Sequence, residues 1–199
     1  MRQFAPGSAP RTERNTHRDP GDVIPVTRRR MLALTAAIAA AGLTIPTATT
    51  SARQVRFAPA GIEVPSIGIE AEVEQVHIIN GVMEAPDDPW KVGWYPQLAF
   101  PGQGANVVMA GHKDWWDVGP AVFWDLTEIA PGDEIRLTSA GDDVLTYIVS
   151  SVDGISAATP PSEYTAEVGH EQLTLITCSG SFNGASYDER LIVRALLDA

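Results

Sequence analysis

Short apolar runs separated by turn residues fill most of the chain from residue 57 onward. Two such runs, Ile78-Ile79 and Val82-Met83, flank Asn80-Gly81, and this pattern predicts a two-residue β-hairpin. Residues 133–137 and 144–152 form a second candidate strand pair. Many short strands with turn residues between them are typical of a β-sandwich or a β-barrel. The pattern therefore predicts an all-β domain.

One segment of this part of the chain has the pattern of a helix instead. Residues 120–129 begin with Pro120, and proline suits the first turn of a helix. The apolar side chains of the segment would share one helical face: Val122, Phe123, Leu126 and Ile129. We therefore expect a short helix over residues 120–129.

The first 56 residues differ from the rest in composition. Residues 1–27 are polar and lack apolar periodicity, which predicts disorder. Three arginines at residues 28–30 precede an apolar stretch at residues 31–45, an arrangement typical of an export signal. The stretch is shorter than the roughly 20 residues of a membrane span, so a cleaved signal peptide and a retained membrane anchor are both open. The expected location is the extracytoplasmic face of the cell membrane, or outside the cell if the signal is cleaved.

Charge and cysteine content narrow the class of protein further. Residues 1–56 carry nine Arg against three acids, whereas residues 57–199 carry five Lys or Arg against 22 acids, a net charge of −17. Such an acidic domain repels polyphosphates, so we expect no nucleic-acid partner. A single cysteine forms no internal disulfide, and the length of residues 57–199 suits one folded domain.

The one cysteine lies at the end of a predicted strand, and two basic side chains lie at the ends of other predicted strands. Residues 173–178 alternate so that Thr174, Ile176 and Cys178 share one face, and we expect the strand to end at Cys178. Residues 106–110 predict another strand, and His112 follows its end. Arg190 opens a further apolar run. Three strand ends would thus present a thiol, an imidazole and a guanidinium, which is the chemistry of a cysteine nucleophile.

The expected roles follow from the needs of acyl transfer. A thiol is mostly protonated at neutral pH, and a neighbouring cation favours the nucleophilic thiolate. Cys178 would be the nucleophile, and His112 would protonate the leaving amine. Arg190 would donate hydrogen bonds to the substrate or the oxyanion.

These motifs resemble those of the sortase family, the membrane-anchored cysteine transpeptidases of Gram-positive bacteria. The resemblance rests on Thr174-Leu175-Ile176-Thr177-Cys178, on Arg190 before an apolar run, and on Ala110-Gly111-His112 upstream. Residues 92–95, 119–123 and 130–135 most resemble the class F sortases.

The resemblance implies a closed sortase-type β-barrel of about eight strands with one or two short helices, and the same roles for Cys178, His112 and Arg190. It also implies a catalytic domain over residues 57–199 that cleaves an LPxTG-like (Leu-Pro-x-Thr-Gly) sorting signal of secreted proteins. The acyl group would then pass to an amine of a peptidoglycan precursor or cross-bridge. Membrane association would depend on the N-terminal segment. Two alternatives stay open: a secreted cysteine hydrolase without transfer, and a non-catalytic extracellular β-barrel binding module.

Three further residues are candidates for substrate binding. Thr177 precedes the nucleophile, as in the family pattern, and its hydroxyl could assist the site. Trp115 and Trp116 follow His112 closely and could wall a peptide groove, although ordinary packing under a loop is an equal alternative. The chain shows no metal-ligand spacing, so we expect neither a metal nor another cofactor.

Overall fold

The computed structural model describes residues 55–198. The predicted N-terminal tail, with its apolar stretch at residues 31–45, lies outside this part of the chain. Among the described residues, no helix has both the length and the apolar character that crossing a membrane requires.

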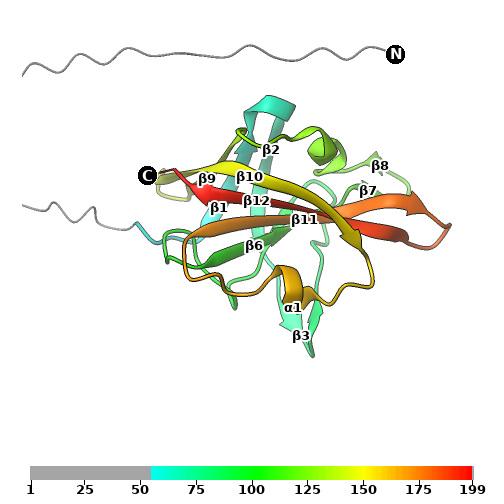
Figure 1. Ribbon diagram of the computed structural model, residues 1–199. Helices are drawn as coiled ribbons and strands as arrows, with labels where there is room; N and C mark the ends of the chain where they lie inside the picture. The colour runs from blue at the N-terminus through cyan, green and yellow to red at the C-terminus, as the bar shows by residue number, and fades with distance from the viewer. Residues whose placement is uncertain (1–54, 199) are drawn as a thin grey trace, which may run out of the picture. The chain divides into compact units, whose positions relative to one another are not determined.

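Eight strands close into a barrel (Figure 1), which confirms the predicted fold class. The barrel strands are β1 (Pro59–Val64), β2 (Ile69–Gln75), β5 (Val92–Trp94), β6 (Asn106–Ala110), β9 (Glu134–Ser139), β10 (Val144–Ser156), β11 (Gln172–Phe182) and β12 (Tyr187–Leu197). Around the barrel they follow the order β1, β2, β5, β6, β11, β12, β10, β9. The pairs β2–β5 and β6–β11 are parallel and the others are antiparallel.

Smaller elements lie between the barrel strands. They are the hairpins β3 (Ile78–Ile79) with β4 (Val82–Met83) and β7 (Asp114–Trp115) with β8 (Gly119–Pro120), the 3₁₀ helices η1 (Pro65–Ile67) and η2 (Trp124–Glu128), and the short helix α1 (Pro161–Tyr164). The predicted hairpin turn is confirmed, because Asn80 and Gly81 have φ angles of 52° and 80°. A tight hairpin turn needs such left-handed residues, and Asn and Gly adopt them most readily.

The predicted helix over residues 120–129 was wrong in extent and in type. Pro120 belongs to β8, and only the 3₁₀ helix η2 forms further along. The buried residues of this segment explain the difference, since Phe123, Leu126 and Ile129 recur every third residue. That spacing matches the three residues per turn of a 3₁₀ helix better than the 3.6 of an α-helix.

The barrel wall separates two apolar cores. Alternate residues of each strand point to opposite faces, so Leu175 and Val193 face the barrel interior whereas Ile176 and Ile192 face outward. The outward-facing residues form a second, smaller core that the β3–β4 hairpin and α1 cover: Val76, Tyr95, Val108, Ile176 and Ile192, with Ile78, Met83 and Tyr164 packed against them. Cys178 continues this outer row, because it lies two residues beyond Ile176.

The connection between β10 and β11 is anchored to the barrel at two points, Ala166 and Glu171. The Asn106 side chain donates to the Ala166 carbonyl at 3.0 Å. Further along, the Glu171 carboxylate accepts hydrogen bonds from the Gly102 amide at 2.8 Å and from the Tyr147 hydroxyl at 2.7 Å. These bonds fix the connection that carries α1 beside the outer core.

Candidate active site

Cys178 lies within β11 rather than at its end, so the predicted strand end was wrong. The strand continues to Phe182 because residues 180–181 form a bulge opposite Asp188 instead of a turn. Gly180 has a φ of 79°, and the Ser181 amide donates to the Asp188 carboxylate at 2.6 Å. A glycine is needed here, since a Cβ would lie 2.2 Å from a carboxylate oxygen of Asp188.

Arg190 also lies inside its strand, directly opposite Cys178 in the β11–β12 register. Residues opposite each other in an antiparallel pair point to the same face, so the thiol and the guanidinium share the outer face. The Nη1 atom of Arg190 donates to the Glu189 carbonyl at 2.9 Å and to the Tyr187 carbonyl at 3.5 Å. The other two guanidinium nitrogens of Arg190 have no hydrogen-bond partner among the described residues, and no carboxylate there forms a salt bridge with Arg190.

His112 follows β6, which pairs with β11 as far as Ala110 and Ile176. Its ring is half-buried and is held from two sides. The Nε2 atom lies 2.8 Å from the buried Pro86 carbonyl, and the Trp115 ring packs edge to face with ring centres 4.6 Å apart. A carbonyl only accepts hydrogen bonds, so Nε2 carries a proton and Nδ1 is the nitrogen left to exchange one.

Thr177 of β11 bonds to the segment that follows β6, next to the residues Cys178 and His112. Its side chain faces the barrel interior and is only 2% exposed, and its hydroxyl donates to the Gly111 carbonyl at 2.9 Å. The Gly111 amide in turn donates to the Ile176 carbonyl at 3.1 Å. These two bonds fix the backbone before His112 against the backbone before Cys178.

A groove of about 420 Å³ brings Cys178, His112 and Arg190 together on the outer face of the barrel. The β3–β4 hairpin contributes Val82 and Met83 to one wall, and α1 contributes Tyr164 to another. Ala110 and Ile176 line it from the barrel. The groove is thus largely apolar and holds the thiol, imidazole and guanidinium among its lining groups.

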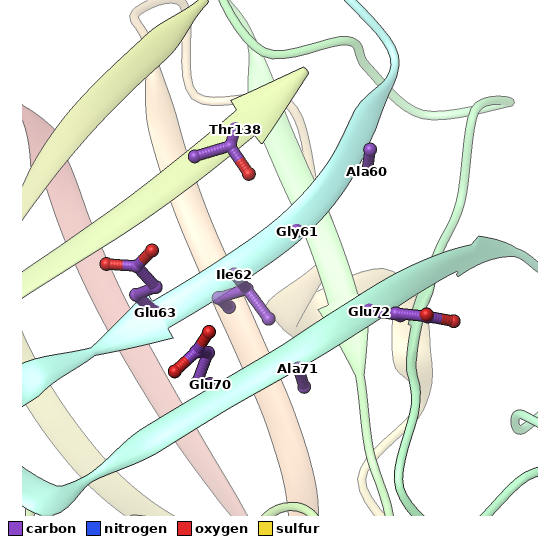
Figure 2. Close-up of a pocket in the computed structure, with 8 residues that line it drawn as sticks. All are labelled: Ala60, Gly61, Ile62, Glu63, Glu70, Ala71, Glu72 and Thr138. Carbon is purple, nitrogen blue, oxygen red and sulfur yellow. The ribbon is translucent and has the colours of Figure 1, made fainter. Parts of the chain in front are cut away.

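Another hollow lies on the outside of β1, β2 and β9 and has a different character (Figure 2). It opens where Gly61 lacks a side chain, and Glu63 and Glu70 lie opposite each other beside it. Its lining holds no thiol, imidazole or guanidinium group. The groove at Cys178 is therefore the candidate active site.

The two tryptophans singled out from the sequence do not line the groove. Trp115 contacts the His112 ring, whereas Trp116 is 82% exposed on the β7–β8 hairpin. Their role in substrate binding stays a prediction. Sequence reasoning missed Val82, Met83 and Tyr164, and the only available signal was the predicted hairpin, whose tip exposes 67% of Val82.

Two tyrosines near the groove have perturbed titration. A hydrogen bond to the Asp114 carboxylate, with smaller contributions from burial and from the Cys178 thiolate, raises the pKa of Tyr187 to about 12. Burial raises the pKa of Tyr164, and the Arg190 guanidinium opposes that shift. Both hydroxyls therefore keep their protons at neutral pH.

Within residues 55–198, no cluster of three or more acidic, His or Cys side chains is arranged to hold a metal ion.

Comparisons with known proteins identify the family and the fold of this chain. The sortase domain family model matches residues 62–198. A lid mutant of sortase A from Corynebacterium diphtheriae has a similar structure, with 23% identity, coverage of 74% of this chain and 73% of that chain, and a TM-score of 0.56. The sortase D5 transpeptidase of Clostridium perfringens gives 22% identity, 71% and 79% coverage, and a TM-score of 0.55. Sortase C of Streptococcus pneumoniae has 22% identity, coverage of 72% of this chain and 69% of that chain, and a TM-score of 0.56. No curated protein matches this chain.

The closed barrel and the family match together define the class, which is that of the cysteine transpeptidases. The family match covers most of the described residues, and this chain belongs to the sortase family. Its substrates are accordingly a protein that carries a sorting signal and an amine nucleophile. The solved structures belong to classes A, C and D at identities that reflect the shared fold alone, so the class F prediction stays a prediction.

Proposed function

We propose that Cys178, His112 and Arg190 are the catalytic residues of a sortase that cleaves an LPxTG-like sorting signal and attaches the protein to a cell-wall amine. The observation that carries this proposal is the placement of Cys178 opposite Arg190, with His112 lining the same groove. Acyl transfer requires the thiol and both basic groups around one peptide carbonyl, and the groove that all three residues line supports this arrangement.

In the first half of the reaction, the Cys178 thiolate attacks the carbonyl carbon of the threonine in the sorting signal. The tetrahedral intermediate collapses as the bond to glycine breaks, and His112 gives its Nδ1 proton to the departing amine. A thioester then joins Cys178 to the substrate. In the second half, an acceptor amine attacks the thioester and passes its extra proton to His112. The thiolate leaves, and a new amide bond joins the substrate to the acceptor.

Arg190 is the proposed stabiliser of the negative charge that develops on the substrate oxygen. Its position opposite the nucleophile and its free guanidinium N–H groups support this role. A planar guanidinium donates two parallel hydrogen bonds, which suits an oxyanion better than a single ammonium group does. Scarcity of bases adds support, because residues 57–199 carry only five Lys or Arg.

The groove and the N-terminal segment support the remaining parts of the proposal. Val82, Met83 and Ile176 offer an apolar surface for the leucine and proline of the signal. The arginines at residues 28–30 and the apolar stretch at residues 31–45 support export, with the enzyme at the extracytoplasmic face of the membrane or secreted. Residues 92–95 and 119–123 support assignment to class F.

A transfer assay tests the proposal directly. The purified protein is mixed with an LPxTG peptide library and triglycine, and the products are identified by mass spectrometry. We expect cleavage between threonine and glycine, a peptide joined to triglycine, and a thioester on Cys178. Cys178→Ala should fold normally, because the substitution is small, and form no product. Turnover by this variant, or hydrolysis without transfer at any triglycine concentration, would contradict the proposal.

A further inference from the structure

One side-chain hydrogen bond joins the two segments that carry His112 and Arg190. The Tyr187 hydroxyl donates to the Asp114 carboxylate. Asp114 lies in β7, two residues after His112, and Tyr187 begins β12, three residues before Arg190. Figure 1 shows β7 and β8 beside the end of β11 and the beginning of β12. The proposed mechanism gives this bond no chemical step.

The surroundings of both side chains make the bond a rigid connection. Phe182 packs against the Tyr187 ring with ring centres 5.2 Å apart, and the Lys113 ammonium lies 5.1 Å from the centre of the same ring. On the other side of the bond, Trp115 follows Asp114 directly and packs against the His112 ring. A restraint on Asp114 is thus passed to the imidazole through one neighbouring residue.

The His112 carbonyl accepts a hydrogen bond from the buried Phe123 amide at 2.9 Å, so the backbone of His112 is tied to the segment after β8 and not to β11 or β12. Pairing between β6 and β11 ends at Ala110 and Ile176, and the last ties on that side go to Gly111. Among the described residues, no hydrogen bond joins the His112 side chain to Cys178 or Arg190. Within residues 55–198, the bond from Tyr187 to Asp114 is the side-chain hydrogen bond that joins the segment after His112 to β12, beside the contact of the Lys113 ammonium with the Tyr187 ring.

We infer that Tyr187 and Asp114 form a positioning pair that holds the His112 imidazole in place beside Cys178 and Arg190. This inference rests on the proposed function, because it assigns the pair a role through His112. Hydrogen bonds to a charged group are stronger than neutral ones, so a phenol on a carboxylate suits a structural tie. The raised pKa of Tyr187 is consistent with a hydroxyl that stays protonated and bonded throughout the neutral range.

The test combines four variants of the pair with two readouts. Tyr187→Phe removes the hydroxyl and keeps the ring, Asp114→Ala removes the acceptor, and the double variant removes both. We expect each single variant to lower kcat for transfer about tenfold, which corresponds to the loss of one charge-assisted hydrogen bond. The double variant should be no slower than either single variant, because both changes break the same bond. Asp114→Asn keeps an acceptor oxygen and should recover part of the rate.

The second readout is the rate of Cys178 alkylation by iodoacetamide between pH 5 and pH 10. A displaced imidazole no longer favours the thiolate, so the profile of Tyr187→Phe should shift toward that of His112→Ala. This measurement needs no peptide substrate, so it tests the pair even if the wild-type protein transfers no sorting signal. The matched control is Ser151→Ala, which removes a 2.9 Å hydroxyl–carboxylate bond to Asp153 on β10 and should leave both readouts unchanged.

Two results would overturn the inference. One is an alkylation profile of Tyr187→Phe identical to that of the wild type. The other is a double variant whose rate loss equals the product of the two single losses, which would show independent roles. If Tyr187→Phe melts far below the wild type, the alkylation profiles of Asp114→Ala and Asp114→Asn are compared instead. Identical profiles for these two variants and the wild type would overturn the inference in the same way.

Discussion

Cys178 on β11 and Arg190 on β12 are directly opposed in the register of the barrel. Ile155 of β10 lies opposite Arg190 on its other side, so the guanidinium lies in the middle of three paired strands. A position inside a sheet restricts the backbone more than a strand end does. The proposed oxyanion donor therefore lies on a rigid element.

Arg190→Lys should lower kcat strongly although it keeps the positive charge. The lysine loses the planar fork, and loss of one oxyanion donor costs about 2.7–4 kcal/mol, on the order of 10²–10³ in rate. Steady-state transfer kinetics measure the effect. Arg194→Lys is the matched control, since Arg194 lies on the same strand in a salt bridge with Asp153. Near-normal turnover of Arg190→Lys would show that charge alone suffices.

Thr177→Val should destabilise the protein and slow the reaction. The valine keeps the shape of the buried side chain but leaves the Gly111 carbonyl without its donor at 2.9 Å. We expect the free energy of unfolding to fall by about 1 kcal/mol. Thr177→Ser keeps the hydroxyl and should retain the wild-type rate to a greater degree. Denaturant unfolding and transfer kinetics give the two measurements, and equal rates for the Val and Ser variants would show that the bond has no role in catalysis.

Gly111→Ala should displace the segment that carries His112. A Cβ at this position would lie 2.6 Å from the ring of Phe123, which is fully buried and cannot move aside. Overpacking of this kind costs about 1–3 kcal/mol in stability. Gly141→Ala is the control, because its Cβ would meet nothing closer than 3.7 Å. Thermal melting compares the two, and equal melting temperatures would show that the backbone before His112 yields easily.

The stability of the protein should fall between about pH 10 and pH 12. An unperturbed tyrosine has a pKa of 10.0. The hydrogen bond to Asp114 is the main reason that the pKa of Tyr187 rises to about 12. In this window the unfolded chain has lost the proton that the folded chain still binds, so the stabilisation present below pH 10 is lost as pH rises. Burial raises the pKa of Tyr147 as well and adds to the loss.

Tyr187→Phe isolates the contribution of this hydroxyl. Its melting temperature should fall less than that of the wild type between pH 10 and pH 12, while the contribution of Tyr147 stays common to both. Parallel curves would show that Tyr187 is not the group that titrates.

The amino-acid sequence alone determined the local features of this protein. Asn80-Gly81 fixed a hairpin because few residues adopt left-handed backbone angles without strain. Strand alternation placed Ile176 and Cys178 on one face because its period of two is a property of the extended chain itself. The three candidate catalytic residues could also be chosen from residue type and spacing.

Only the tertiary structure decided how these features meet. The bulge at Gly180 kept β11 and β12 paired beyond the site, which put Cys178 opposite Arg190 within the sheet rather than at its edge. The face shared by Ile176 and Cys178 turned out to border a second core outside the barrel. Register, bulges and groove walls depend on contacts between segments far apart in sequence, and no local pattern encodes those contacts.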